Sequence, residues 1–295
     1  MTTSVKVLAD SIAKDAPRLT TLQIRMPRPL WPEFLTHRVF SRNASSSRAI
    51  PVARLIQDAI DDPYIPSHWG KNEPGMQARE EQESLVDIGK FLKLSHPFTV
   101  TNVEAWLEMR NQAIAMAMAY SEAGYHKQIV NRLLEPFTHI NAVVTATAWD
   151  NFLELRTHED AEPHIRIVAN EIEKALSESI PEFLYNDEWQ FPYIREEEFG
   201  IYDTPKLIKI SVARCARVSY MTHDGRIPDP VEDLKLYSRL ANAVPAHLSP
   251  LEHQATPDIL DNTAGLSFWS MPHLHANLVG WRQNRKFVEY ASEVE

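Results

Sequence analysis

The sequence predicts an α+β fold: one helix-rich domain of 295 residues with a small mixed or antiparallel sheet. Residues Thr21–Met26 alternate between apolar and polar, as a half-buried strand does. Helical patterns, the longest of them over Asn102–Glu122, outnumber the strand-like segments. The hydrophobic content of 44% is enough for a substantial core.

The first unit, residues 1–60, is predicted to contain a strand, a helix, a loop and a second helix. After the strand, Trp31–Phe40 has the pattern of a short helix opened by proline, which places His37 and Arg38 on that helix. Pro51 suits the first position of the next helix, Val52–Ile60.

Residues 60–79 form a connector in which Pro66, Pro74 and Gly75 forbid a continuous helix. A loop of this length is either functional or disordered, and Trp69 and Met76 favour an ordered one. Trp69 is available for stacking on a flat heterocycle, or it packs the loop itself.

Residues 80–180 are predicted to be a helical region. Within it, Ala115–Ala119 consists of small or flexible apolar residues that suit close packing in a core, and Gly124 is expected to end a helix. The predicted helices are Glu80–Leu94, Asn102–Glu122, Lys127–Arg132, Asn141–Arg156 and Pro163–Ser179.

Residues 205–295 are predicted to form a strand-helix unit, reached through a surface connector from Ser179 to Pro205. Leu207–Val212 alternates as a strand, and Pro230–Ala243 reads as a helix. A further strand and helix are expected within Gly265–Phe287.

Charge and composition exclude several classes of function. The net charge of −10 and pI near 5.7 argue against a nucleic-acid partner, since such binders carry a basic face. No apolar run is long enough to cross a membrane, and the first residues lack the apolar core of a signal peptide, so we expect a soluble, cytoplasmic protein. The single cysteine excludes an internal disulfide, and among apolar neighbours Cys215 is expected to be an inert, packed thiol.

A serine-rich turn precedes the helix at Val52. Ser45, Ser46, Ser47 and Arg48 bring three hydroxyls and a guanidinium close to a helix N-terminus, which is what a phosphate requires. A capped turn with a solvated arginine explains the same residues equally well.

A second cluster lies where one predicted helix ends and the next begins. Arg156 and Arg166 are placed to converge on one corner, with His158 and His164 beside them. A solvated corner with local ion pairs is the alternative. The histidine pairs His158/His164 and His273/His275 lack an obvious third ligand, so we predict no metal site.

The sequence Thr36-His37-Arg38, then seven residues, then Ser46, resembles the Arg-His-Arg and serine signature of the flavin-dependent thymidylate synthases (ThyX). Asn43 and Arg48 also stand at that family's places. The sequence departs from the signature in that Thr36 replaces the first arginine and Ala44 replaces a glutamate.

Two further segments are similar to the same family. Leu155-Arg156, Ala161 and Ile165-Arg166 match its Asn-Leu-Arg and Ala-Gln-x-Glu-Ile-Arg segments, whereas Glu154, Glu162 and His164 depart from them. The segments from Ala216 to Tyr220 and from His247 to His253 resemble stretches that usually come before the Arg-His-Arg motif. Here they come last, so the resemblance implies a circularly permuted order, which requires termini close together at the surface.

The resemblance implies an enzyme that transfers a one-carbon unit from methylenetetrahydrofolate to C5 of dUMP, with FAD as cofactor and NADPH as reductant. It also implies a homotetramer with sites at subunit interfaces, and Arg166 as the catalytic residue that polarises the pyrimidine. The residues implied for FAD are His37, Arg38, Asn43, Arg156, Asp160 and Ser249, and those for the nucleotide are Ser45, Ser46, Ser47, Arg48, His139 and Arg166.

Two other functions stay open. One is an FAD- and folate-dependent hydroxymethylase of a pyrimidine deoxynucleotide, dUMP or dCMP, in which water traps the one-carbon intermediate; Thr36, Ala44 and the permuted order favour it. The other is a non-catalytic nucleotide-binding protein that kept the shape of the pocket.

Overall fold

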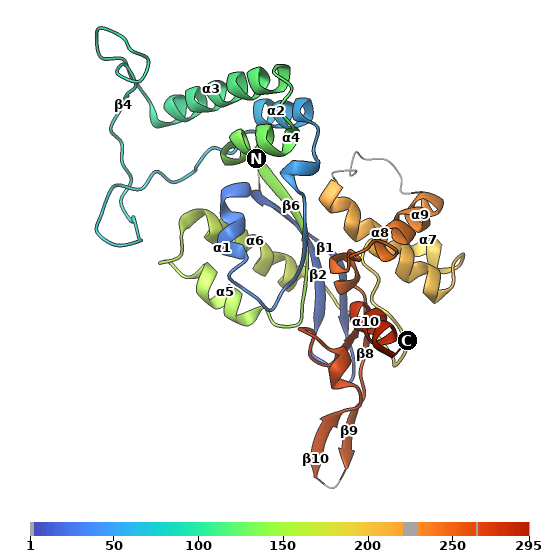
Figure 1. Ribbon diagram of the computed structural model, residues 1–295. Coiled ribbons are helices and arrows are strands. Elements are labelled where there is room, and N and C mark those ends of the chain that lie inside the picture. Colours follow the sequence, from blue (N-terminus) through green and yellow to red (C-terminus); the bar gives the residue numbers. More distant parts are fainter. Residues whose placement is uncertain (1–2, 221–228, 264, 295) are drawn as a thin grey trace.

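A five-stranded sheet forms the centre of the computed structural model, which describes residues 3–220, 229–263 and 265–294 (Figure 1). Neighbouring strands are antiparallel except the last, which runs parallel to β1, so the predicted small mixed sheet and α+β class are confirmed. In spatial order the strands are β3 (Ser41–Ala44), β6 (His139–Ala146), β2 (Leu19–Pro27), β1 (Ser4–Ile12) and β7 (Glu182–Phe183).

Two helices cover the first face of this sheet, α5 (Asp150–Thr157) and α6 (Pro163–Glu178). In β2, Ile24 pairs with Ala142 of β6, and both side chains are fully buried on this face. Helix α6 begins with Pro163 behind a Glu162 cap that accepts hydrogen bonds from two backbone amides, and it turns an apolar stripe toward the sheet. The first turns of α5 and α6 thus have defined positions beside the strands.

The opposite face is covered by α8 (Thr204–Tyr220), with α7 (Glu196–Phe199) and α9 (Pro230–Ala241) packed against it. Leu207–Val212 is therefore helical, and the prediction of a strand there was wrong. Cys215 lies on this helix and is completely buried beside Val143, as expected of a packed thiol. Burial raises the pKa of its thiol well above the usual range.

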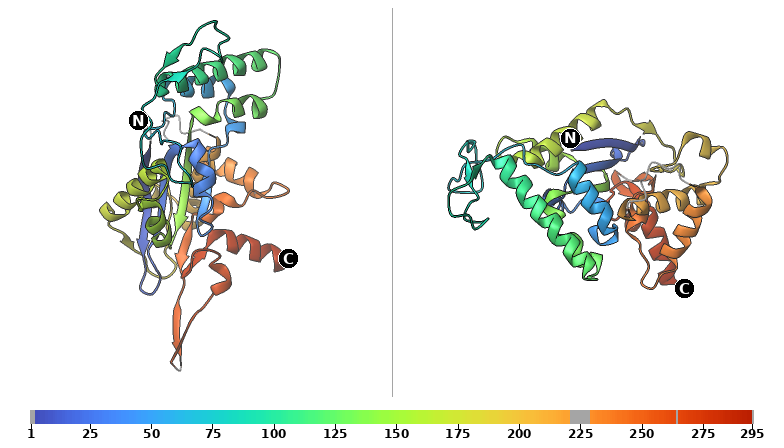
Figure 2. Two further views of the ribbon diagram at one scale, coloured as in Figure 1. Left: turned by 90° about the vertical axis from the view of Figure 1, so that its left-hand side faces the viewer. Right: turned by 90° about the horizontal axis from the view of Figure 1, so that it is seen from above.

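A third helical group lies at one end of the sheet (Figure 2). It contains α2 (Val52–Asp61), α3 (Asn102–Glu122) and α4 (Lys127–Val130), followed by two short 3-10 helices, η3 (Asn131–Leu133) and η4 (Glu135–Phe137). Thr101 and Glu104 form a capping box that fixes the start of α3. The core assignment of Ala115–Ala119 holds only for Ala117, because Met116 and Met118 are 50% and 49% exposed.

Three other segments differ from the prediction. Glu80–Leu94 is not a helix: it contains strand β4 (Val86–Asp87), which pairs with β5 (Thr99–Val100), followed by turns. Its exposed side chains offer no apolar stripe that a helix would bury. The predicted helix Asn141–Arg156 is strand β6 followed by α5, because this segment is inserted between two strands and buried on both faces. The region 80–180 is therefore not wholly helical.

The predicted helix Trp31–Phe40 is also too long. Helix α1 spans only Trp31–Phe34, and His37 and Arg38 lie in the turns after it. Phe34 and Phe40 enter the same core cluster from both ends of these turns, which requires the chain to bend between them. β3 then follows at once.

The C-terminal segment packs against the rest of the chain through Trp281, which is fully buried and donates its Nε1–H to Pro17 O at 2.7 Å. The helix predicted to end at Phe287 begins only at Asn284. The elements are η5 (Ser249–Glu252), β8 (Ala255–Pro257), β9 (Leu260–Thr263), β10 (Leu266–Trp269), η6 (Pro272–Leu274), β11 (Trp281–Gln283) and α10 (Asn284–Val294).

The beginning of β1 and the end of α10 lie apart in all three views (Figures 1 and 2). The circular permutation therefore stays a prediction. Within the part of the chain that the structure describes, no helix combines the length and the apolar character needed to cross a bilayer.

Candidate active site

His37 is held by aromatic side chains at the end of the α1 turn. It is 9% exposed, and its ring packs edge-on against Phe152 of α5 with 4.9 Å between ring centroids. Burial, and then the charge of Arg156, lower the pKa of His37. The imidazole is therefore neutral at physiological pH. Arg38 follows it at the surface.

Arg156 of α5 joins this turn, so two of the predicted segments meet. Its Nε–H donates to His37 Nε2 at 3.1 Å, which leaves the proton of the neutral ring on Nδ1. Its Nη1 forms an ion pair with Glu33. Its Nη2 donates to Thr36 Oγ1 at 3.4 Å, so Thr36 takes part in the contact as a hydroxyl.

The segment near position 250 reaches the same region from the other side. Helix η5, which begins at the exposed Ser249, packs against β3, the strand that follows His37 and Arg38. Arg42 of β3 donates to His37 O at 3.3 Å, so β3 contacts both η5 and the turn that carries His37. Asn43 is different from the other predicted residues: it is 6% exposed and donates to Cys215 O at 3.1 Å, a contact within the core.

The serine turn is a second group. Ser45 Oγ accepts a hydrogen bond from Asn141 N at 3.1 Å, and Ser47 Oγ donates to Glu135 Oε1 at 2.5 Å, so these two hydroxyls hold the turn in place. Ser46 is half-buried and Arg48 is exposed. Neither side chain has a hydrogen-bond partner among the described residues, so both are available to a ligand.

Two arginines beside this turn were missed by the sequence reasoning. Arg28 is mostly buried, and its Nη1 donates to Ser45 O at 3.3 Å. Burial lowers the pKa of its guanidinium. Arg132 of η3, 59% exposed, lies 3.8 Å from Glu135, the residue that holds Ser47. Nothing in the sequence indicated that Arg132 lies near the serine turn, because it stands inside a predicted helix. The packing of η3 against η2 (Ser47–Ala49) brings it beside that turn.

Arg166 and Asp160 form part of a third group at the turn between α5 and α6. Arg166 Nη1 donates to Glu159 O at 3.1 Å, and Asp160 accepts from Arg79 at 2.5 Å. A pocket of about 490 Å³ lies between this turn and residues 68–79. Neither Ser46 nor His37 lines it. Within one chain, the structure therefore places Arg166 in a pocket that these residues do not share.

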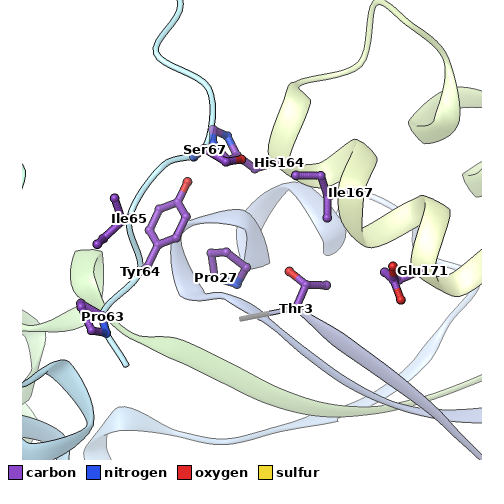
Figure 3. A pocket seen from close by; sticks show the side chains of 9 residues that line it. All are labelled: Thr3, Pro27, Pro63, Tyr64, Ile65, Ser67, His164, Ile167 and Glu171. Atoms are coloured by element: carbon purple, nitrogen blue, oxygen red, sulfur yellow. Dashed lines mark hydrogen bonds between the residues drawn. The ribbon is translucent and has the colours of Figure 1, made fainter. Parts of the chain in front are cut away.

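A hollow of about 410 Å³ lies on the other side of His164 (Figure 3). The backbone amide of Ser67 donates to His164 Nε2 at 3.0 Å, and the Tyr64 hydroxyl points toward these two residues. His139 lies behind Tyr64, with 6.3 Å between the ring centroids. It does not line this hollow; burial and the charge of Arg25 lower its pKa to about 4.

No group of three or more potential metal ligands from His, Cys, Asp and Glu occurs in the described ranges. His158 is exposed 3.8 Å from Asp160, and His164 is bonded to Glu162. His275 is buried against Asp258 at 2.8 Å. Each of these histidines has a local partner that explains its position.

The family model described as "Thymidylate synthase complementing protein" matches residues 19–182, which is more than half of the chain. The chain belongs to this family. The matched range contains the His37 turn, the serine turn and the α5–α6 turn. Membership supports a thymidylate synthase-like enzyme.

Among solved structures, the chain is similar to the UMP/dUMP methylase PolB from Streptomyces cacaoi, bound with 5-Br dUMP or with 5-Br UMP. For the first structure the identity is 17% and the TM-score 0.38, and the match covers 54% of this chain and 66% of that one, just under two thirds. For the second the values are 16%, 0.39, 59% and 88%. No curated protein sequence matches the chain.

Proposed function

We propose that the protein is a flavin-dependent thymidylate synthase-like enzyme that transfers a one-carbon unit from methylenetetrahydrofolate to C5 of dUMP. The observation that carries this proposal is the hydrogen bond from Arg156 to His37 at 3.1 Å. It joins two signature segments that lie 119 residues apart, within the range matched by the family model.

FAD is the proposed cofactor, and the side chains around His37 fit it. Arg38 is exposed and has no carboxylate partner among the described residues, as a residue that binds a diphosphate requires. Arg156 contacts the same turn from α5, and Ser249 is assigned to the cofactor from η5, which packs against β3. Bound reduced FAD would supply reducing equivalents that NADPH replenishes. Asn43 and Asp160 fit this role less well, because Asn43 bonds within the core and Asp160 lies in the third group.

The nucleotide phosphate is assigned to the serine turn, where Ser46 and Arg48 are available and Arg132 adds a third donor. Ser45 and Ser47 position the turn. Arg166 is assigned to the pyrimidine ring. A guanidinium stays cationic at all working pH values, so it stabilises negative charge that develops on the ring without acting as a base.

A second copy of the chain is proposed to bring the separate groups together. Helix α3 carries an uncharged run from Asn111 to Ser121, and Met116 and Met118 are about half exposed there. Exposed methionines on an uncharged helix face are typical of a surface covered in an oligomer. This face adjoins the serine turn through α4 and η3. We therefore propose a homo-oligomer, with the tetramer of the family as the expected form.

Hydroxymethylation of dUMP or dCMP is the second candidate. The observation that favours it is Thr36, whose hydroxyl accepts the Arg156 hydrogen bond where the family signature has a further cation. With one charge fewer beside the cofactor, reduction of the one-carbon intermediate competes less well with attack by water.

The test has two stages. The purified protein is first examined for the visible absorption bands of bound flavin, which are expected. It is then incubated with dUMP, UMP or dCMP and labelled methylenetetrahydrofolate, with and without NADPH, and the product is weighed by mass spectrometry. A methylated dUMP whose formation requires NADPH supports the synthase. A hydroxymethylated product would instead support the second candidate. Nucleotide binding without flavin and without product would show a non-catalytic binding protein.

A further inference from the structure

A hairpin between α2 and α3 forms one wall of the pocket that holds Arg166. Its two arms, residues 69–82, are joined by hydrogen bonds from Lys71 N to Glu80 O and from Gln82 N to Trp69 O, both 2.8 Å. A Cβ on Gly70 would lie 2.4 Å from Ala78 Cβ, so only glycine lets the arms approach this closely. The hairpin therefore has a defined shape, in agreement with the ordered loop expected from the sequence.

The hairpin is attached to the first turn of α6 and to α3. The amides of Ser67 and His68 donate to His164 Nε2 at 3.0 and 3.3 Å. The other nitrogen, His164 Nδ1, lies 2.5 Å from Glu162 Oε1. Trp69 packs edge-on against Trp106 of α3, with 5.9 Å between ring centroids. These contacts fix the hairpin beside His164, which lies two residues before Arg166 on α6.

Two guanidinium groups line this open pocket, Arg79 from the hairpin and Arg166 from α6. Arg79 is 70% exposed and is paired with Asp160 at 2.5 Å, whereas Arg166 has no carboxylate partner within the described ranges and donates only to Glu159 O. The carboxylate of Glu162 also lines the pocket, but it is occupied by His164 and by the cap of α6. Glu159 also lines the pocket and adds a negative charge near Arg79, but the ion pair that the structure gives Arg79 is with Asp160, so Asp160 is the counter-ion that an incoming anion would replace.

We propose that Arg79 and Arg166 form an anion-binding subsite, and that Arg79 binds a phosphate or carboxylate group of a substrate in place of Asp160. A guanidinium presents paired N–H donors that match either anion, and an exposed ion pair is weak enough to exchange. The identity of the ligand rests on the proposed function, which places the nucleotide phosphate at the serine turn and therefore leaves the glutamate carboxylates of the folate for this subsite.

The subsite can be tested without assaying the reaction. Phenylglyoxal modifies arginines, and peptide mass spectrometry gives the rate at each one. Arg54 is the matched control, because it is 67% exposed and paired with Asp58 at 2.9 Å on α2. Inorganic phosphate is expected to slow the modification of Arg79 and Arg166 but not of Arg54. In Asp160→Asn, protection should need about tenfold less phosphate, because the internal competitor is gone.

The proposal is wrong if phosphate protects Arg79 no more than Arg54, or if Asp160→Asn needs more phosphate. Pairs of ligands that differ only in the anionic group identify the molecule that supplies the anion. Protection by a folate but not by its analogue without glutamate supports the folate carboxylates as the ligand. Protection by dUMP but not by deoxyuridine keeps the subsite but contradicts the assignment of the nucleotide phosphate to the serine turn. Protection by phosphate alone supports the subsite and counts against the proposed function, so the two failures are distinguishable.

Kinetics supply a second readout if the enzyme turns over. Arg79→Gln should raise the KM of the anionic substrate about tenfold and leave kcat within about twofold, with Arg79→Lys in between. Arg54→Gln should match the wild type. An unchanged KM in Arg79→Gln would contradict the proposal, as would a loss confined to kcat.

Discussion

Arginine and histidine side chains at the candidate site differ in how completely the protein has already bonded them. Arg156 is bound to Glu33, Thr36 and His37, so it organises the turn that carries Arg38. Among the described residues, Arg166 donates only to the carbonyl of Glu159, so most of its N–H groups are free to bond to a ligand. The first arrangement suits a positioning role, and the second suits a group that meets substrate.

Arg166→Ala is expected to lower turnover by at least about 100-fold, because it removes the cation assigned to the charge that develops on the pyrimidine. Flavin content should equal that of the wild type, since Arg166 lies in a pocket that His37 does not share. Both are measured on one preparation, by product formation and by absorbance. Full activity in this variant would refute the assignment, and Arg54→Ala controls for the loss of an exposed arginine.

His139 and His253 are expected to make the protein less stable at mildly acidic pH. Burial lowers the pKa of His253 to about 3, and burial with the charge of Arg25 lowers that of His139 to about 4. The unfolded chain therefore binds protons that the folded chain rejects. Stability is lost as pH falls below about 6.5, by about 1.4 kcal/mol per pH unit for each histidine.

Urea unfolding between pH 7.5 and 4.5 measures this slope. His139→Gln should reduce it by the contribution of one proton and leave the midpoint at pH 7.5 close to the wild type. An identical slope in the two proteins would show that His139 is protonated equally in both states.

At the scale of the element, a buried charge network links α7, α8 and α9 behind the sheet. Arg214 of α8 is 2% exposed and bonds to Glu198 Oε1 and Oε2 at 2.6 Å each and to Asp233 Oδ2 at 2.9 Å. Burial works to raise the pKa of Glu198, but hydrogen bonds from Arg214 and Arg195 lower it to about 2. Glu198 is therefore ionised. Arg214 bonds to both buried carboxylates, whereas Arg195 bonds to Glu198 and Arg217 bonds to Asp233.

Arg214→Met is expected to lower the free energy of unfolding by about 3 kcal/mol, because it removes the guanidinium that bonds to both buried carboxylates and leaves Glu198 with only Arg195 and Asp233 with only Arg217. Lys206→Met on the same helix is the control. Its amine is 54% exposed and 3.8 Å from Asp203, so its loss should change stability by no more than about 0.5 kcal/mol. Equal urea midpoints for the two variants would contradict the importance of the network.

At the scale of the whole molecule, the single chain leaves its candidate groups apart. The serine turn adjoins α3 and α4, whereas Arg166 lies at the turn between α5 and α6. The uncharged face of α3 beside the serine turn is the surface proposed to meet another copy. Association there would change the surroundings of Ser46 and Arg48 without changing the fold.

Substitution of both Met116 and Met118 by Glu is expected to produce a smaller species in light scattering after size-exclusion chromatography, because charge would have to be buried in the interface. The melting temperature of the chain itself should change little, since both side chains are about half exposed. Ala117→Glu, at a fully buried position between them, should instead destabilise the fold. An unchanged mass in the double variant would place the interface elsewhere.

Local signals in the sequence identified those elements whose ends are set by local chemistry. The capping box at Thr101 begins α3, Pro163 opens α6, and Pro230 follows the Asp229 cap of α9. Strand β2 was found because its alternation is visible. The signature segments around His37, Arg156 and Ser249 were likewise found in the sequence, and the family they indicated is confirmed by the match over residues 19–182.

Long-range contacts decided the elements that local pattern misassigned. Residues 139–146 form a strand because β2 and β3 pair with both of their edges, and burial on both faces removes the alternation that would reveal it. Residues 207–212 alternate like a strand, yet they lie within α8, where one face packs on the sheet and another on α9. The strands that pair with residues 139–146 and the sheet that α8 packs on are all far from these segments in the sequence, although α9 is the next helix after α8.

By itself, the sequence determined the α+β class, the capped helices and the membership of the thymidylate synthase complementing family, because these depend on residue types at short spacing. Only the tertiary structure decided that His37 accepts from Arg156, that Arg132 adjoins the serine turn, and that Arg79 shares a pocket with Arg166. Each of these contacts joins elements far apart along the chain, and their approach is set by the packing of helices on the sheet.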